Sequence, residues 1–477
     1  MKNRTLFFVL TLIGFAAATP LLSGCRLLGS SASQAYADYQ AAIAAGDLTH
    51  AQIALLQLVN AKQDVPEYWI ELGQIDLQLG QYSQAYDAFS HAHELDRTNI
   101  EVQATLTQLA LLAGQVPLAD EQAKTLALLA PDHPAVALVR GYVALASGDL
   151  DKADKEADGL LANTPDDPNV KILKAKILIE RTRIDDAITL LENQHQTVPN
   201  DRSAIRALTA IYRNRSDWRD VARLQSDLHK LDPNDLNVSR ALVEASLRAG
   251  DVGTAQTLSQ SLLSTNANVQ FIDSVLAIWA RSAPPGVILA NADKLASAST
   301  GDKRVAFADY FNKIGKSAVA AALLGRARLP SATANSRWNA VLAEALALQG
   351  RTSEATQLFS LVLRTEPDQV DALRGRSALE ARTGNAKQAV VDAQRLISVS
   401  PQTGEDRILL AEAYLASGNR NQVRRTLWQA FQDLPSDGRV FSALRSVLVS
   451  TGDIDGAKRL GDEFADQRIA KLKKDLI

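Results

Sequence analysis

A glycine followed by a polar residue recurs along this 477-residue chain at a fixed step of 34 residues. The step is regular in Gly46-Asp47, Gly80-Gln81, Gly114-Gln115 and Gly148-Asp149. It continues through Thr182-Arg183, Ser216-Asp217 and Gly250-Asp251, and it resumes at Gly350-Arg351, Gly384-Asn385, Gly418-Asn419 and Gly452-Asp453. A fixed period of this length is typical of a solenoid in which each short unit packs on its neighbours. The period therefore predicts one long array instead of several separate globular domains.

The repeat unit from Pro66 to Asn99 predicts a helical hairpin. Apolar residues recur at helical spacing over 67–79 and 83–95, and Gly80-Gln81 separates the two stretches. Five residues after the turn, most units carry alanine, whose small side chain lets two helices approach closely. These alanines are Ala51, Ala85, Ala119, Ala153, Ala187, Ala255, Ala320, Ala355, Ala389 and Ala457, and the other units have Val221, Leu289 and Val423. Seventeen residues after the turn, several units carry a proline that ends one helix and can open the next, namely Pro131, Pro165, Pro199, Pro233, Pro367, Pro401 and Pro435.

These features together resemble the tetratricopeptide repeat family over about residues 34–466. The residues that carry the resemblance are Trp69-x-x-Leu72-Gly73, the small residue after the turn, Phe89 and the terminal prolines. The resemblance implies an all-α fold, a right-handed superhelical solenoid of about 12–13 helix hairpins whose first helices line a concave groove. It also implies recognition of other proteins instead of one particular reaction.

The regular step fails between Gly250 and Gly350, where the expected turn falls at Pro284-Pro285. We therefore expect an N-terminal array over 34–282, a degenerate repeat or hinge over 283–330, a C-terminal array over 331–466 and a capping helix over 467–477. A capping helix would cover the apolar face of the terminal repeat. The irregular stretch is compatible with a hinge that divides the array and equally with a rigid repeat that has a different turn.

The N-terminus has the pattern of a secretion signal. Two basic residues are followed by an apolar run over 6–18 and by Leu22-Ser23-Gly24-Cys25. The apolar run is short for a membrane span and is interrupted at its end. Residues 1–24 resemble the signal peptide and lipobox of bacterial lipoproteins, which implies that the mature chain begins at Cys25 and that its thiol carries acyl chains such as palmitate. The alternative is an ordinary cleavable signal in which Cys25 is only a small apolar residue.

A lipidated Cys25 would tether the chain to a membrane without spanning it, because two or more acyl chains give stable anchoring. Arg26 follows Cys25, whereas an aspartate there would resemble an inner-membrane retention signal. We therefore expect an outer-membrane location on the periplasmic side. Residues 25–33 contain Gly29-Ser30-Ser31 and predict a brief tether.

Basic residues recur in the first helices of three successive units, and they are candidate binding residues: Lys176, Arg206, Arg213, Arg240 and Arg248. The resemblance implies that such positions tend to face the groove, where an acidic partner segment could form charge-assisted hydrogen bonds. The alternative is that these side chains serve solubility and pair with acids one turn away. Ala210 stands where chaperone-binding relatives carry a clamp asparagine, so the pattern does not favour chaperone C-termini.

No motif in the sequence gives a catalytic interpretation a starting point. His91 and His93 are two residues apart on a predicted helix, where their side chains diverge. The acids between Asp149 and Asp158 lack the spacing of a calcium loop, since Ala153 stands where a ligand is needed. We predict no enzyme activity, catalytic residue, metal site, cofactor or small-molecule substrate, and the net charge of -3 argues against a nucleic-acid partner.

The function expected from these features is that of a lipid-anchored scaffold. It would mediate protein–protein interactions with partners of the cell envelope, on the periplasmic side of the outer membrane. Lipoproteins of similar build suggest an assembly for exopolysaccharide export or secretion. The alternative is a lipoprotein that regulates a peptidoglycan synthase.

Overall fold

The computed structural model describes residues 32–476 except 266–267, 326–335 and 401–402. The predicted signal over 1–24, Cys25 and nearly all of the tether lie outside the described residues. Within the described residues the structure has 26 helices and no strand, which confirms the all-α fold class. None of the helices described is both long enough and apolar enough to cross a bilayer.

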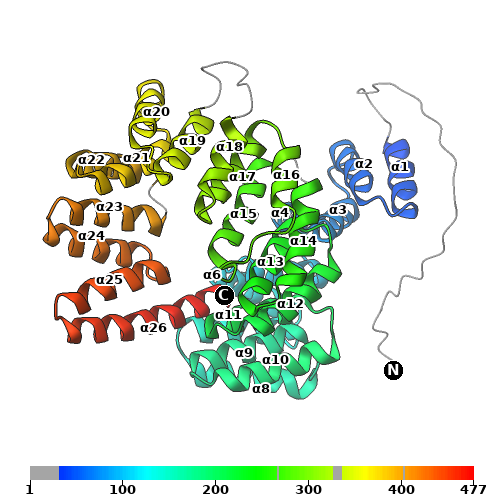
Figure 1. Cartoon of the computed structure of the whole chain (residues 1–477). Helices are drawn as coiled ribbons and strands as arrows, with labels where there is room; N and C mark the ends of the chain where they lie inside the picture. The colour runs from blue at the N-terminus through cyan, green and yellow to red at the C-terminus, as the bar shows by residue number, and fades with distance from the viewer. Residues whose placement is uncertain (1–31, 266–267, 326–335, 401–402, 477) are drawn as a thin grey trace. The chain divides into compact units, whose positions relative to one another are not determined.

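The chain forms two compact units, residues 1–139 and 140–477. The helices of the first unit are α1 (Ala32–Ala44), α2 (Leu48–Ala61), α3 (Pro66–Gln78), α4 (Tyr82–Leu95), α5 (Ile100–Leu112) and α6 (Val116–Leu129). Helix α7 (Pro134–Ala146) contains the division between the units. Consecutive helices pack as hairpins, and in each hairpin we call the odd-numbered member the first helix (Figure 1).

The second unit begins within α7 and holds the remaining helices. The first group is α8 (Leu150–Asn163), α9 (Pro168–Glu180), α10 (Ile184–Thr197), α11 (Arg202–Arg215), α12 (Trp218–Leu231), α13 (Leu236–Ala249), α14 (Val252–Thr265), α15 (Val269–Ser282), α16 (Ala292–Ala298) and α17 (Gly301–Lys313). The second group is α18 (Ser317–Gly325), α19 (Ser336–Leu348), α20 (Thr352–Thr365), α21 (Val370–Thr383), α22 (Ala386–Val399), α23 (Gly404–Ala416), α24 (Arg420–Asp433), α25 (Gly438–Ser450) and α26 (Ile454–Leu476).

The periodic glycines have a left-handed backbone conformation, and each follows the end of a first helix. Gly80 has φ +74°, its N–H donates to the Leu77 carbonyl at 3.1 Å, and the next N–H donates to the Asp76 carbonyl at 2.8 Å. These bonds satisfy carbonyls that the helix end would leave unpaired. Thr182 and Ser216 occupy the same place with φ 60° and 62°. The 34-residue step is therefore a repeat of backbone conformation, which glycine adopts at the lowest steric cost.

The small residues five positions after the turn are buried throughout the described array. The alanines are between 0% and 6% exposed, Val221 is 0% exposed, Leu289 is 2% exposed and Val423 is 5% exposed. This burial agrees with the packing demand expected from their recurrence. A larger side chain at an alanine position would have to displace the neighbouring helix.

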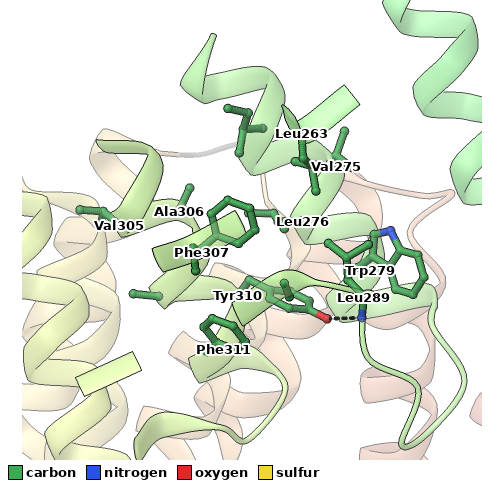
Figure 2. Packing of buried hydrophobic residues seen from close by; sticks show 14 of the residues in the cluster. Leu263, Val275, Leu276, Trp279, Leu289, Val305, Ala306, Phe307, Tyr310 and Phe311 are labelled. Carbon is green, nitrogen blue, oxygen red and sulfur yellow. Dashed lines mark hydrogen bonds between the residues drawn. The ribbon is translucent and has the colours of Figure 1, made fainter. Parts of the chain in front are cut away.

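The irregular stretch is tightly packed. After α15 the chain forms no helix until the seven-residue α16, and Leu289 of this connection lies in a cluster with Trp279, Phe307 and Tyr310 (Figure 2). The Leu289 N–H donates to the Tyr310 hydroxyl at 3.1 Å. The Gln256 amide binds the same connection by donating to the Ile288 carbonyl at 3.2 Å and accepting from the Ala290 N–H. Apolar packing and hydrogen bonds thus replace the regular second helix here.

Two boundaries differ from those expected from the sequence. The compact units divide inside α7 and not within 283–330, where the cluster around Phe307 continues from α13 to α19. The predicted capping helix over 467–477 is not a separate element, because α26 is one continuous helix of 23 residues. Its sequence contains no proline and no residue in a left-handed conformation to end it at 466.

Replacing Thr182 by glycine is expected to stabilise the hairpin of α9 and α10. A β-branched residue with φ 60° is strained, and glycine relieves about 0.5–1 kcal/mol after its own entropic cost. Hydrogen exchange of the α9 and α10 amides measures this change. The reverse substitution, Gly80→Thr, should destabilise α3 and α4, and a neutral or destabilising Thr182→Gly would contradict the strain argument.

Replacing Tyr310 by phenylalanine removes the acceptor of the Leu289 N–H while retaining the ring. An unpaired buried N–H costs about 1–3 kcal/mol, so we expect a lower urea midpoint and faster exchange of the Leu289 amide. Tyr82→Phe is the matched control, because that side chain is 56% exposed. Equal effects of the two substitutions would show that the hydrogen bond does not hold the connection.

Candidate functional site

The five candidate cations lie on three successive first helices. Lys176 is on α9, Arg206 and Arg213 are on α11, and Arg240 and Arg248 are on α13. Arg206, Arg213 and Arg248 are exposed, while Lys176 and Arg240 are half-buried. Within the described part of the chain, Arg248 is the member of this set that forms an ion pair. The role of these residues in binding stays a prediction.

Lys176 is a half-buried cation over an aromatic ring. Its ammonium nitrogen lies 4.9 Å from the centroid of the Tyr142 ring, within the range of a cation–π interaction. Burial lowers the pKa of Lys176 to about 8. An anionic group beside this ammonium would favour its charged form, so the position suits a carboxylate from a partner.

Arg248 has partners of its own. Its guanidinium pairs with Glu244 one turn earlier at 3.0 Å and lies 4.4 Å from the centroid of the Trp218 ring. For this residue the structure shows the pairing with a nearby acid that the sequence left open as an alternative. Arg248 is therefore already ion-paired, in contrast to Arg206 and Arg213 within the described residues.

The second half of α26 packs against α9 and α11. Leu472 is 2% exposed and lies in the same apolar cluster as Ala207 and Ile211. The Asn214 side-chain amide donates to the Arg468 carbonyl at 2.7 Å. The Arg468 guanidinium donates to the hydroxyl of Ser216, the residue after α11, at 3.3 Å. These contacts join segments about 250 residues apart in the sequence.

An ion pair completes this contact. The Lys473 ammonium donates to the Glu180 carboxylate at 2.6 Å, and the two side chains are 29% and 32% exposed. The sequence predicted that a helix over 467–477 would cap the terminal repeat, whereas Leu472 of this stretch packs in the cluster formed by α9 and α11. Nothing local in the sequence indicated that these helices would cover it.

Charged side chains also form a continuous ladder along the first helices of the second unit. We define the charge ladder as Asp273 on α15, Arg337 on α19, Asp371 and Arg374 on α21, and Asp406 on α23. Arg337 donates to Asp273 at 2.9 Å and lies 3.4 Å from an Asp371 carboxylate oxygen. Arg374 lies 3.3 Å from Asp371 and binds both Asp406 oxygens at 2.7 and 3.0 Å. Acids and bases thus alternate across four first helices.

Two further carboxylates adjoin the ladder. Asp309 pairs with Lys313 at 2.7 Å, and Glu344 accepts a hydrogen bond from the Asn312 amide at 3.3 Å. Burial, together with the negative charge of Asp309, raises the pKa of Glu344 to about 7. Burial also raises the pKa of Asp309. This region therefore favours protonation or a nearby cation near neutral pH.

A pattern of charges in the sequence could have predicted these ion pairs between first helices. Arg337, Asp371, Glu405 and Arg439 follow each other at the 34-residue step, and their charges change sign twice. Arg337 contacts Asp371, and Arg439 contacts Glu405. Side chains one repeat apart lie on adjacent first helices, so opposite charges at this step predict ion pairs between neighbouring hairpins.

Of the acids between Asp149 and Asp158, Asp151, Asp154 and Asp158 are paired with cations. Lys174 binds Asp154 at 2.6 Å and Asp158 at 2.5 Å, and Arg181 binds Asp151 at 2.5 Å. The ring of His91 lies 4.5 Å from that of Trp69. In the described ranges no three His, Cys, Asp or Glu side chains lie together in a way that could hold a metal ion.

Comparison with known proteins finds similarity to tetratricopeptide repeat proteins. A family model described as the N-terminal TPR repeats region of Psidin matches residues 139–280. Human tetratricopeptide repeat protein 13 is 34% identical over 116 residues, which cover 23% of this chain. The chain spans 14% of the length of that human relative.

Solved structures of similar fold include two proteins with low sequence identity. A tetratricopeptide repeat protein from Parabacteroides merdae has 17% identity and a TM-score of 0.35, with 52% of this chain and 99% of that chain covered. Yeast Tom70 has 14% identity and a TM-score of 0.34, with 86% and 95% covered.

Replacing Glu344 by glutamine is expected to flatten the pH dependence of stability. The folded pKa near 7 exceeds the ordinary value of 4.5, so the folded state holds a proton that the unfolded state releases, and stability falls as pH rises from about 4.5 to 7. Glutamine removes this fall and can still accept from Asn312. The variant should be more stable than wild type at pH 8, on the order of 2 kcal/mol, and similar at pH 4.

Urea unfolding at pH 4, 6 and 8, followed by circular dichroism, measures this difference. Glu354→Gln is the matched control, since Glu354 is an exposed carboxylate whose pKa is lowered by a hydrogen bond from Arg351. It should leave the fall between pH 4.5 and 7 in place. A Glu344→Gln variant with the wild-type pH profile would contradict the raised pKa.

Proposed function

Because the chain is a tetratricopeptide repeat protein, we propose that it is a docking scaffold for protein partners of the cell envelope. It is tethered through Cys25 to the periplasmic side of the outer membrane and serves an assembly for exopolysaccharide export or secretion. The repeat fold supports the scaffold part of this proposal. The N-terminal sequence supports the tether and the compartment, and similarity to other lipoproteins suggests the assembly.

The charge ladder is the observation that carries the docking role. Asp406 at one end of the ladder is 1% exposed, whereas the other side chains are between 27% and 36% exposed, so the ladder is anchored at one buried end and is partly open to solvent along the rest. Polar groups fixed in this way lose little conformational freedom when a partner binds. Their alternating charges select a partner with the complementary order and give specificity more than raw affinity.

The ladder is also extended, as a scaffold surface should be. It begins on α15 and ends on α23, with α19 and α21 between them. A small substrate would contact a fraction of such a surface, whereas a protein segment can follow successive first helices. Recognition of a protein segment is therefore the use that this geometry supports best.

A photo-crosslinking residue at position 313 tests this docking role in cells. Lys313 is 44% exposed beside the ladder on α17, so we expect it to capture a protein partner of the envelope. Position 387 is the matched control, because Lys387 is an exposed lysine on the second helix α22. Pore or export proteins captured from position 313 alone would support the proposal. A penicillin-binding protein would favour the regulator, and equal capture from both positions would contradict the docking face.

Replacing Cys25 by alanine tests the tether. Without the thiol no acyl chain can be attached, so the full chain should move from the membrane fraction to the soluble periplasmic fraction. Fractionation followed by immunoblotting measures this shift. Ser23→Ala serves as the control, because it alters the same segment and retains the thiol. A Cys25→Ala chain that stays with the outer membrane would refute lipid anchoring.

A further inference from the structure

Helix α24 forms a groove together with the ends of α23 and α25 and with Glu463 of α26. We call it the α24 groove, and its volume is about 1030 Å³. Residues of α24 from Arg420 to Gln432 make up most of its lining. This volume lies at the upper end of the range for small-molecule pockets, about 300–1,000 Å³. Since α24 and α26 are second helices, the groove is a surface separate from the charge ladder on the first helices.

Three guanidinium groups line the groove against one carboxylate. Arg420, Arg424 and Arg425 come from the first two turns of α24, and the acid is Glu463. Arg424 pairs with Asp453 at 3.2 Å. Arg420 and Arg425 are exposed, and neither has an ion-pair partner among the residues that the structure describes. The groove therefore carries an excess of positive charge that an anionic partner would neutralise.

These cations do not stabilise the helix that carries them. The first turn of α24 contains no acid, and the N-terminus of a helix disfavours positive charge. Arg420 and Arg424 are four residues apart, where like charges on a helix repel each other. The corresponding residues one repeat earlier, Ala386 and Val390, are uncharged. Neither helix formation nor the packing of the repeat therefore accounts for the arginines.

Trp428 gives the groove a fixed aromatic surface. Its ring packs against the apolar cluster that contains Leu427 and Phe431, and its centroid lies 5.9 Å from that of Phe431. The side chain is half-buried, so part of it remains open to the groove. Leu415, which also lines the groove, is 57% exposed. An apolar side chain of a partner would cover this surface without having to order a mobile ring.

We propose that the α24 groove binds an acidic protein segment. Carboxylates of the segment pair with Arg420 and Arg425, because guanidinium groups form strong charge-assisted hydrogen bonds with carboxylates. An apolar side chain of the segment packs on Trp428, since aromatic and arginine side chains together contribute much of the binding energy at protein interfaces.

The dimensions of the groove fit such a segment. The stretch of α24 from Arg420 to Gln432 is about 18 Å long at 1.5 Å per residue, which matches about five residues of extended chain. A single small anion would fill little of this length, and a flat membrane surface would reach the exposed arginines without filling the groove. This inference adds a second docking surface with its own partner chemistry, and it depends neither on the charge ladder nor on Cys25.

A peptide-binding assay tests the proposal. The protein is the chain from residue 25 onward with Cys25→Ala, so that no lipid is attached. The acidic probe is the fluorescein-labelled peptide Glu-Glu-Leu-Glu-Glu-Leu, the neutral probe is Gln-Gln-Leu-Gln-Gln-Leu, and fluorescence anisotropy measures their binding. We expect saturable binding of the acidic probe, weakened at least about tenfold by Arg420→Gln combined with Arg425→Gln. The neutral probe should bind at least about tenfold more weakly than the acidic probe, and high salt should reduce the difference.

A matched double variant separates the groove from net charge. Arg219→Gln combined with Lys387→Gln removes two exposed cations near the starts of the second helices α12 and α22. Its net charge equals that of the groove variant, yet it should bind the acidic probe as tightly as the unchanged chain does. Circular dichroism during urea unfolding checks that both variants fold, which we expect because all four side chains are exposed.

Tryptophan emission locates the probe. Binding of the unlabelled acidic peptide should change the emission of the chain, and Trp428→Phe should abolish this change while it retains an aromatic ring in the groove. A change of equal size in the Trp428→Phe chain would place the peptide elsewhere and contradict the proposal.

Three further results would overturn the proposal. The first is an absence of saturable binding of the acidic probe, and the second is equal loss of binding in the two double variants. The third is binding to vesicles that contain phosphatidylglycerol, lost with Arg420→Gln and Arg425→Gln, in a chain that ignores the peptide, because the partner would then be a membrane surface. None of these results bears on crosslinking from position 313 or on the fractionation of the Cys25→Ala chain, so failure of this inference and failure of the proposed function remain distinguishable.

Discussion

The close approach of two helices after a left-handed turn is the constraint on which the rest of the structure depends. The turn residue reverses the chain, and five residues later a small buried side chain lets the second helix lie against the first. A hairpin made in this way buries only one of its faces, so its remaining apolar surface must pack against the next hairpin. The first helices of successive hairpins then lie side by side, so charges at the repeat step meet as ion pairs. The charge ladder is a consequence of this order. Arg337 on α19 contacts Asp371 on α21, the next first helix, although α20 lies between them in the sequence.

Local features of the sequence predicted the hairpins well because each hairpin is specified within about one repeat. The turns, the buried alanines and the all-α class follow from residues that act on their near neighbours. The sequence did not predict the destination of α26, since Leu472 and Ile211 carry no mark of their contact across more than 250 residues. Residues 283–286 left open both a hinge and a rigid repeat with a different turn, and the structure packs the connection after them on the aromatic cluster of Trp279, Phe307 and Tyr310. In both places the structure depends on packing against residues that are distant in the sequence, and a repeat pattern does not predict that packing.

The features of the candidate surfaces also differ in whether the sequence could predict them. Lys176, Arg206 and Arg213 could be placed on first helices from the period alone, and the structure adds that Arg248 is already paired with Glu244. The charge ladder could also have been found, because its opposite charges recur at the repeat step. The raised pKa of Glu344 could not, since it arises from burial among α17, α19 and α21 more than from any sequence neighbour. Periodicity therefore predicts where side chains stand, while their charge state depends on what packs around them.

Helix α26 changes the way in which the second unit must come apart. An open row of hairpins loses and gains units at its ends, and each step involves only adjacent neighbours. Because Leu472 and Lys473 contact α9 and α11, the last helix of the second unit also packs against two of its early helices. Fraying of α25 and α26 then removes support from α11, so damage at the end of the chain is felt near its middle. The same contact has a high sequence separation, so closing it costs more chain entropy than a contact between adjacent hairpins. The final helix therefore couples the end of the second unit to hairpins near the middle of the chain.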